Sequence, residues 1–472
     1  MKRYEALAAD IAASIQNGTL KPGDKLPSVR QASTSRHVSP ATVFEAYYLL
    51  EAKGLVRSKD RSGHYVAESA VVLPPEPETA SQPDGEARPV VISDLVLGIL
   101  ESAMSRDIVP LGSAFPSPLL FPFDRLGRAT AVAISKLDPW TTVDDLAPGS
   151  PALRQQIALR YLIDGVQIGP AQILITNGAM EALNLCLSAV CKAGDTVLVE
   201  SPCFYVCLQA LERLGLHAVE VATDPRNGID LDALEAAILR HRPKACWVMT
   251  NFQNPLGGAM SEGKKRALVE LITHHQVPLV EDDVYGELHY GNHRPASTKR
   301  FDSEGWVMHC SSFSKMLAPG YRVGWVSPGR FLREVTYQKL TTSLATSIPV
   351  QLGIARYLER GSLERHLRAL RLTLQKNRDQ YIEAISQFFP SGTKVSRPAG
   401  GYFLWIELPR AIDALILHRK AMEAGISIAP GQMFSASCGF ASCARINFGH
   451  PLTTRVEAAL HTVGRTALRL AK

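Results

Sequence analysis

Apolar residues near the start of the chain recur at helical spacing. Tyr4, Leu7, Ile11 and Ile15 fall on one face, which predicts an amphipathic helix over residues 3–16. An Asn-Gly pair follows directly and is typical of a helix end. We therefore expect an opening helix that buries one face against neighbouring elements.

Two more helices and a β-hairpin are predicted in the stretch that follows. A helix over residues 28–35 begins at a Pro-Ser pair that can cap it, and a helix over residues 39–51 begins with Ser-Pro, a cap followed by a favoured first residue. Alternating runs over residues 55–58 and 63–66 predict two short strands joined by a basic turn. Three helices and a basic hairpin in this order form the pattern of a winged helix-turn-helix.

Short β-rich stretches alternate with helical patterns in the larger remainder of the chain. Strands are predicted over residues 173–176, 196–200, 245–249 and 277–281. This alternation predicts βαβ units, hence an α/β domain with a mainly parallel sheet. Ligands of such sheets bind at the carboxyl ends of the strands.

Residues 70–90 separate the two patterns. They contain five prolines, several acidic residues and no aromatic side chain, so they cannot build a core of their own. We expect a DNA-binding domain over residues 1–69, a proline-rich linker over residues 70–95 and a second domain over residues 96–472.

Composition indicates a soluble globular protein but does not indicate an activity. The chain has 472 residues, 46% of them hydrophobic and 20% charged, as in soluble globular proteins. No apolar run is long enough to span a bilayer, so we expect a cytoplasmic protein with no membrane partner. The net charge of +6 permits an acidic partner but does not require one. The eight cysteines show no metal-ligand spacing, and Cys203 with Cys207, or Cys438 with Cys443, are expected to be reduced thiols in or near the core.

The segment 311–315, Ser-Ser-Phe-Ser-Lys, carries the most informative chemistry. It places Lys315 among small hydroxyl residues, and Arg322 follows seven residues later. A deprotonated lysine amine can attack an aldehyde, while serine, arginine and backbone N–H groups suit a phosphate. The pattern predicts a Schiff base between Lys315 and pyridoxal phosphate. A solvated lysine in a serine-rich loop is an equally good explanation of this segment alone.

Other polar or aromatic residues follow predicted strands. Gly178 opens a helix whose free N–H groups suit a phosphate, and Asp282 can pair with a pyridine nitrogen. Asn254 and Tyr285 can both bond a phenolate oxygen, and Phe204 can stack on a ring. Taken singly, these residues also fit an ordinary turn, an acidic cap or a core aromatic. Near the C-terminus, residues 400–405 are predicted to form an edge strand, and a further strand carries Arg445 pointing inward.

Three motifs mark the small unit. They are PGDxLPSxR at residues 22–30, SxxTVxxAYxxLxxxG at residues 39–54 and GxYV at residues 63–66. They resemble the GntR family of regulators, which implies binding to double-stranded DNA through the third helix and the wing. One departure is that residues 31–38 lack the apolar core usual for the second helix. The predicted DNA contacts are Arg30, Ser39, Thr42, Lys59, Arg61 and Gly63.

The larger unit, from about Pro110 to the C-terminus, resembles fold-type I pyridoxal-phosphate enzymes of the aspartate aminotransferase class. The resemblance implies a large mainly parallel domain, a smaller C-terminal α+β subdomain and a homodimer. It also implies that Arg445 binds a substrate or effector carboxylate. A tyrosine that reaches the partner's phosphate in this class is replaced by Asp144, so that contact is in doubt. The implied cofactor residues are Lys315, Asp282, Tyr285, Asn254, Phe204, Gly178, Ala179, Met180, Ser312, Ser314 and Arg322, of which Lys315, Asp282 and Tyr285 are catalytic.

The whole chain resembles the MocR subfamily of GntR regulators. The function that follows is a transcriptional regulator that senses pyridoxal phosphate, or its adduct with an amino acid or related amine, and binds an operator. A working aminotransferase with an appended DNA-binding domain is the alternative, and a purely structural DNA-binding scaffold is the third possibility. Loops around residues 112–123 and 425–440 are expected to select the amino compound.

Overall fold

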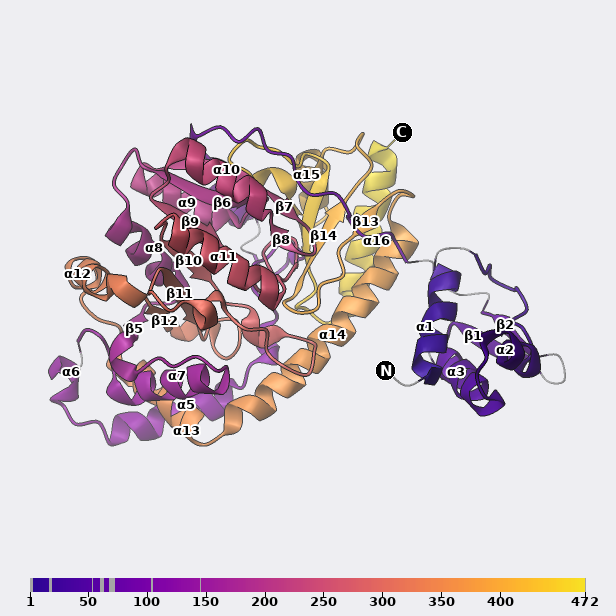
Figure 1. Cartoon of the computed structure of the whole chain (residues 1–472), viewed down its shortest axis with the longest axis horizontal. Helices are drawn as coiled ribbons and strands as arrows, with labels where there is room; N and C mark the ends of the chain where they lie inside the picture. The colour runs from indigo at the N-terminus through magenta and orange to yellow at the C-terminus, as the bar shows by residue number, and fades with distance from the viewer. Residues whose placement is uncertain are drawn as a thin grey trace. The chain divides into compact units, whose positions relative to one another are not determined.

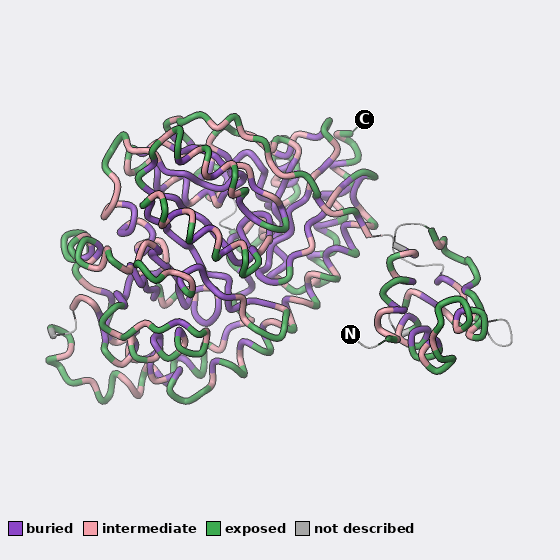
Figure 2. Tube along the Cα trace, in the orientation of Figure 1, coloured by how far each residue is buried: buried purple, intermediate pink, exposed green. Residues whose placement is uncertain are grey.

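The chain folds into two compact units. The computed structural model describes residues 3–16, 19–52, 54–59, 63–67, 73–102, 105–144 and 146–471. The first unit comprises Met1–Pro75 with Ile382–Phe389, and the second comprises Glu76–Tyr381 with Pro390–Lys472. Each unit has its own buried interior (Figure 2).

The small unit contains the three expected helices and the hairpin. The helices are α1 (Arg3–Gln16), α2 (Val29–Arg36) and α3 (Pro40–Ala52), and the hairpin is β1 (Val56–Lys59) with β2 (Gly63–Val66), paired antiparallel. Helix α2 forms although its sequence is poor in apolar residues, because Ser28 and Gln31 make a reciprocal capping box and Ala32 is buried. The core is apolar and comes from all three helices and the hairpin, with Leu7, Ile11, Ile15, Ala32, Val43, Tyr47, Leu50 and Val66 among its members.

The large unit is built on a mainly parallel sheet. In spatial order the strands are β3 (Arg88–Pro89), β7 (His217–Asp224), β6 (Thr196–Ser201), β9 (Ala245–Val248), β10 (Leu279–Asp282), β11 (Val307–Ser312), β12 (Gly324–Ser327) and β5 (Leu174–Thr176), and β8 (Gly228–Ile229) pairs with β7. The run from β7 to β11 is parallel, whereas β12 is antiparallel to both of its neighbours. The four predicted strands are therefore confirmed, each within two residues of its predicted limits.

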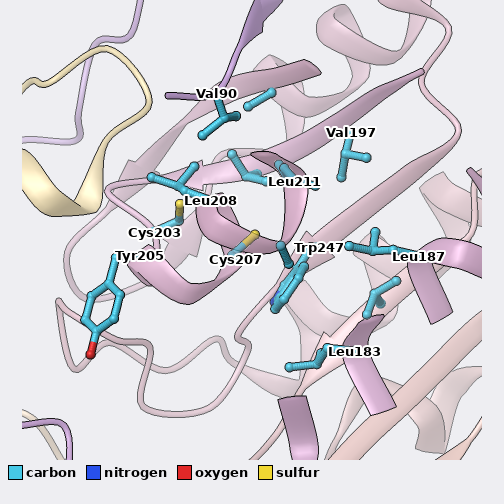
Figure 3. Packing of buried hydrophobic residues seen from close by; sticks show 14 of the residues in the cluster. Val90, Leu183, Leu187, Val197, Cys203, Tyr205, Cys207, Leu208, Leu211 and Trp247 are labelled. Carbon is cyan, nitrogen blue, oxygen red and sulfur yellow. The ribbon is translucent and has the colours of Figure 1, made fainter. Parts of the chain in front are cut away.

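Helices cover both faces of this sheet (Figure 1). Helices α8 (Ala179–Val190) and α9 (Tyr205–Leu214) pack against one cluster of buried residues, and α10 (Leu231–His241) and α11 (Glu262–His274) pack against another. Figure 3 shows part of the first cluster, in which Trp247 of β9 lies close to Leu183 and Leu187 of α8. This double burial explains why the strands read as continuous apolar runs. The other helices of the unit are α4 (Ser93–Ser102), α5 (Phe123–Ser135), α6 (Thr141–Asp144), α7 (Pro151–Ile163), α12 (Leu332–Thr342) and α13 (Ile348–Glu359).

The C-terminal part contains a separate antiparallel sheet. Its order is β13 (Lys394–Val395), β14 (Phe403–Glu407), β17 (Cys443–Asn447) and β16 (Ala429–Pro430), accompanied by α14 (Ser362–Phe388), α15 (Ala414–Glu423) and α16 (Thr454–Leu470). The predicted edge strand over residues 400–405 is wrong in its position, because β14 has hydrogen-bonded neighbours on both sides. A short parallel pair, β4 (Val109–Pro110) and β15 (Ile426–Ser427), lies apart from both sheets.

Much of the expected linker is held against the large unit. Strand β3 pairs with the edge strand β7, and the Ser81 N–H donates to the Thr223 carbonyl at 3.1 Å. The Glu76 carboxylate lies 3.2 Å from the Arg226 guanidinium. The proline-rich composition therefore marks an extended segment, and from residue 76 onward that segment is bound to the large unit.

The described residues contain neither a membrane-spanning helix nor a metal-ligating cluster, and most of the four cysteines singled out are buried. Across the residues that the structure describes, no helix combines the length and apolarity needed to cross a membrane, and no group of three metal-ligating side chains occurs. Cys203, Cys207 and Cys443 are buried free thiols, as expected, but Cys438 is exposed and so is not a core residue.

Candidate cofactor site and DNA interface

A cavity of about 520 Å³ lies at the carboxyl ends of the parallel strands. Residues from the ends of β6, β10 and β11 and from the start of α8 contribute to its wall, which is where an α/β sheet places its ligands. The lining residues are Ala114, Phe115, Ala179, Met180, Leu183, Phe204, Tyr205, Val206, Asp282, Val284, Tyr285, Ser312, Ser314, Lys315, Pro319, Gly320 and Arg322.

Lys315 follows β11 and turns its amine into this cavity. Its Nζ donates to the Ala114 carbonyl at 2.8 Å and lies 3.8 Å from the centre of the Phe115 ring. Burial lowers the pKa of this lysine to about 7, with Arg445 and Arg322 adding repulsion and Asp282 opposing the shift. A large share of the amine is therefore neutral near pH 7, the form that attacks a carbonyl carbon.

Asp282 ends β10 and is almost completely buried in the same cavity. Its Oδ1 has no hydrogen-bond partner within the protein. Burial raises the pKa of this carboxyl to about 7, Asp283 adds to the shift and Lys315 opposes it. A buried acceptor without a donor is costly unless a ligand supplies one, and a protonated ring nitrogen is such a donor.

The other end of the cavity suits an anion. The Arg322 Nη1 donates to the Ser314 hydroxyl at 3.3 Å, and Nη2 donates to the Asn177 carbonyl at 3.4 Å. Gly178 caps α8 with φ +83°, and a Cβ there would lie 2.5 Å from Arg322 Nη2. Glycine therefore lets the guanidinium lie beside the start of the helix, where free N–H groups and the guanidinium together suit an anion such as phosphate.

A buried hydrogen-bonded chain runs from the cavity wall into the protein through Tyr285, Asn254 and Arg445. The Asn254 Nδ2 donates to the Tyr285 hydroxyl at 3.4 Å, and Arg445 Nη1 donates to Asn254 Oδ1 at 2.9 Å. Arg445 Nη2 donates to the Gly112 carbonyl at 2.7 Å, and the residue is 0% exposed. Tyr285 lines the cavity, whereas Asn254 and Arg445 do not. A carboxylate that reached Arg445 would have to replace the Gly112 carbonyl.

Aromatic residues after β6 supply one wall. Phe204 lines the cavity and is partly buried, while the adjacent Tyr205 is buried with its ring centre 6.0 Å from the Arg445 guanidinium. Of the predicted cofactor residues, the structure brings Lys315, Asp282, Tyr285, Phe204, Ala179, Met180, Ser312, Ser314 and Arg322 to the cavity and leaves Gly178 and Asn254 just behind it.

Residues 112–115 were not predicted as contacts of the lysine or the arginine. The Ala114 carbonyl accepts from both Lys315 and the Tyr402 hydroxyl, and Gly112 accepts from Arg445. The sequence placed this stretch only within a loop expected to set specificity. Backbone carbonyls leave no residue-type signal, so the pattern could not single them out.

The predicted DNA-binding residues lie on the small unit. Arg30 and Ser39 are exposed, Thr42 is half-buried, and Gly63 is exposed with φ +106°. The Ser39 hydroxyl accepts from the Thr42 N–H at 3.2 Å, so it caps α3 as predicted. Arg61 and the side chain of Lys59 lie outside the described residues, and so does the side chain of Asp144.

Two family models match the chain. Residues 146–462 match aminotransferase class I and II, and residues 3–66 match the bacterial regulatory proteins of the gntR family. The first match covers the cavity residues from Ala179 to Arg322 but not Ala114 and Phe115, and the second covers the three helices and the hairpin.

Full-length relatives carry both parts in the same order. The chain is 43% identical to the uncharacterized HTH-type transcriptional regulator YdcR of Escherichia coli, over 98% of this chain and 99% of the relative. The chain belongs to the MocR subfamily of GntR transcriptional regulators. A second E. coli regulator of this architecture, YjiR, is 38% identical over 99% of each chain.

The large unit of this regulator also resembles solved aminotransferases. LysN, an α-aminoadipate aminotransferase from Thermus thermophilus complexed with N-(5'-phosphopyridoxyl)-L-leucine, superposes with a TM-score of 0.72 and 28% identity. The match covers 80% of the regulator and 95% of LysN. A MocR regulator therefore combines a GntR DNA-binding unit with an aminotransferase fold.

Proposed function

We propose that this GntR-type regulator binds pyridoxal phosphate in the cavity around Lys315 and uses it to sense an amino acid or related amine. The proposal is supported by three groups that lie together in one cavity. They are the Lys315 amine of lowered pKa, the Asp282 carboxyl with its unpartnered Oδ1, and the Arg322–Ser314 anion pocket. A pyridine ring that bears an aldehyde and a phosphate needs those three groups together.

Pyridoxal phosphate supplies an aldehyde that an amine can join and a ring that withdraws electrons from the joined atom. Each protein group has one task toward it. Lys315 presents a neutral amine, Asp282 holds a proton on the ring nitrogen, and Tyr285 with Asn254 can bond the ring oxygen. Phe204 provides an apolar surface for one ring face.

The wall left for the amino compound is apolar. It is lined by Phe115, Leu183, Val206 and Pro319. The described charged groups of the cavity are Asp282, Lys315 and Arg322, each of which the cofactor would engage. We therefore expect an uncharged side chain on the compound sensed, because an unpaired second carboxylate would be buried at a cost.

Control of transcription requires that the ligand favour one arrangement of the protein over another. We expect a homodimer, whose two DNA-binding units engage an operator with two half-sites. The chain that joins the small unit to residue 76 would link DNA binding to ligand binding. The ligand would then change operator affinity through the large unit.

The test begins with the full-length protein loaded with pyridoxal phosphate. Visible absorbance is recorded while single amino acids are added, with methionine and glutamate as a pair of similar length, and operator affinity is measured in parallel. A spectral change with methionine at lower concentration than with glutamate, accompanied by altered DNA affinity, is expected. No visible band after loading would reject cofactor binding, and an unchanged DNA affinity would reject the sensor.

A working aminotransferase is the second candidate, and the completeness of the cavity favours it. Lys315 can hold and return a proton because its pKa of about 7 lies near the working pH. The measurement is repeated conversion of the bound cofactor between its aldehyde and amine forms when an amino acid and then a keto acid are supplied. A change that never reverses would contradict a working aminotransferase and would be consistent with a sensor.

A further inference from the structure

Helix α3 lacks the side chains that usually read bases. Its thirteen residues, PATVFEAYYLLEA, include no arginine, lysine, histidine, asparagine or glutamine. Those residue types make most bidentate contacts to guanine and adenine in the major groove. From α3, bases can therefore be contacted only by hydroxyl, carboxylate or apolar side chains, such as Thr42, Glu45 and Phe44.

The faces of α3 are sharply divided. Val43, Ala46 and Leu50 are fully buried in the core of the small unit. On the opposite face, Phe44 is 58% exposed and Tyr48 is 65% exposed. Large aromatic side chains left in water on a helix of a small domain indicate a surface that contacts another molecule.

Phe44 occupies the position from which base edges are reached. It is the fifth residue of α3, about 6 Å along the axis from Pro40, so it lies within the N-terminal part that enters the groove in helix-turn-helix proteins. Tyr48 lies one turn deeper into the helix. The hydroxyls of Ser39 and Thr42 are 2.8 Å apart and bond to each other at the cap.

Two of the described cations of the small unit belong to other segments than α3. Arg30 on α2 is exposed, and the Lys25 amine lies 5.7 Å from the centre of the Tyr65 ring beside the hairpin. Such side chains suit phosphates, which position a protein without reading sequence. The exposed side of α3 therefore presents the aromatic rings of Phe44 and Tyr48, with exposed Glu45 beside them.

We propose that Phe44 is a specificity-determining residue that reads thymine through its 5-methyl group. Thymine is the base that presents an apolar group in the major groove, and apolar side chains contact it there. The inference goes beyond the proposed sensing function and rests only on DNA binding by the GntR unit. Exposed Glu45, next to Phe44, can accept from a cytosine amino group, so half-sites that contain thymine beside cytosine are expected.

The test uses the full-length protein and operators selected from random double-stranded DNA. Each thymine of the selected half-site is replaced in turn by uracil, which removes only the methyl group. For the wild-type protein, one or two of these changes should weaken binding about three- to fourfold each, the effect of burying one such group. The Phe44→Ala variant should bind thymine and uracil sites equally.

Tyr48→Ala is the matched control, because it removes an equally exposed aromatic from the same face and should retain the uracil penalty. Since Phe44 is exposed, its replacement should leave the melting temperature unchanged. Equal binding of thymine and uracil by the wild-type protein would overturn the proposal, and so would a penalty that persists in Phe44→Ala. A change of oligomeric state in Phe44→Ala without loss of thymine preference would assign this face to a protein partner instead.

Discussion

Asp282 ends β10 and Asp283 follows it directly, but one carboxyl faces the cavity and the other is held by neighbouring side chains. Asp282 faces the cavity, where its Oδ1 has no partner in the protein. The Asp283 carboxylate accepts from Asn251 Nδ2 at 3.0 Å and from Arg294 Nη2 at 2.5 Å, and it lies 3.1 Å from His309 Nε2. Successive strand residues point to opposite sides, so one carboxylate is available to a ligand and the other is part of the structure.

Asp282→Asn should therefore weaken cofactor binding without unfolding the protein. The amide keeps the shape but loses the negative charge that holds a proton on the ring nitrogen. We expect at least tenfold weaker binding of pyridoxal phosphate, since a charge-assisted hydrogen bond contributes about 1.5–3 kcal/mol. Absorbance titration measures the affinity, and thermal unfolding without cofactor serves as the control. Wild-type affinity in this variant would contradict the assignment.

Asp283→Asn should have the opposite outcome. Removing one partner from a buried ion pair costs roughly 3–5 kcal/mol, so the free energy of unfolding should fall by that order while any folded protein still loads the cofactor. Burial opposes ionisation of Asp283, but Arg294 and His309 outweigh it and hold its pKa below the ordinary value. Its stabilisation is thus complete above the ordinary pKa of an aspartate and is lost as the pH falls below it. Urea unfolding at several pH values should show a weaker acid dependence in the variant.

Gly178→Ala should damage the anion pocket. The residue has φ +83°, and a Cβ would lie 2.5 Å from Arg322 Nη2, so the guanidinium must move away from α8. We expect pyridoxal phosphate to bind about tenfold or more weakly, because a charge-assisted contact to phosphate is weakened, while pyridoxal, which lacks the phosphate, binds as before. Gly263→Ala is the control, because nothing lies within 4 Å of that Cβ position. Equal loss for both ligands would place the phosphate elsewhere.

The rate of cofactor loading should depend on pH through Lys315. Only the neutral amine attacks the aldehyde, and the pKa of Lys315 is about 7. The rate should rise about tenfold per pH unit below 7 and level off above it, whereas an ordinary lysine would continue to gain up to pH ~10. Stopped-flow absorbance with pyridoxal measures this profile free of phosphate titration. A rate that climbs steadily to pH ~10 would show that the amine is not activated.

Ser28→Ala should loosen α2 within the intact chain. The Ser28 hydroxyl accepts from the Gln31 N–H at 3.3 Å, and the Gln31 side chain accepts from the Ser28 N–H at 3.0 Å. Loss of such a cap costs about 1 kcal/mol, so amides of α2 should exchange with solvent about fivefold faster. Thr34→Ala, at an exposed position of the same helix, should change exchange less. Equal effects of both substitutions would assign the stability to helix propensity.

Sequence patterns located the strands and the titratable residues of the cavity well. Val277–Glu281 was predicted as a strand, and β10 ends one residue later at Asp282. Such patterns depend on the alternation of β-rich and helical stretches and on polar residues that follow strands. They failed for residues 400–405, because neighbours within a sheet are set by pairing partners far away in sequence.

The contact between Lys315 and Ala114 spans 201 residues in sequence. Because it involves a backbone carbonyl, it could not be predicted from residue types. The same holds for Arg445, whose inward direction was predicted. Its enclosure by Gly112 and by the rings of Phe403 and Phe434 was not. Side-chain chemistry is visible in a sequence, whereas enclosure depends on which distant segments meet.

The sequence by itself determined the two-unit architecture, the order of helices and strands, and which lysine, aspartate and arginine could serve one cofactor. These properties follow from local periodicity and from the chemistry of residue types. Only the tertiary structure decided that Asp282 Oδ1 lacks a partner while the Asp283 carboxylate has three, that Arg445 is fully buried, and that Phe44 stands exposed on α3. Burial and pairing arise when distant segments pack together, and that packing sets the pKa of Lys315 and the surface that DNA can reach.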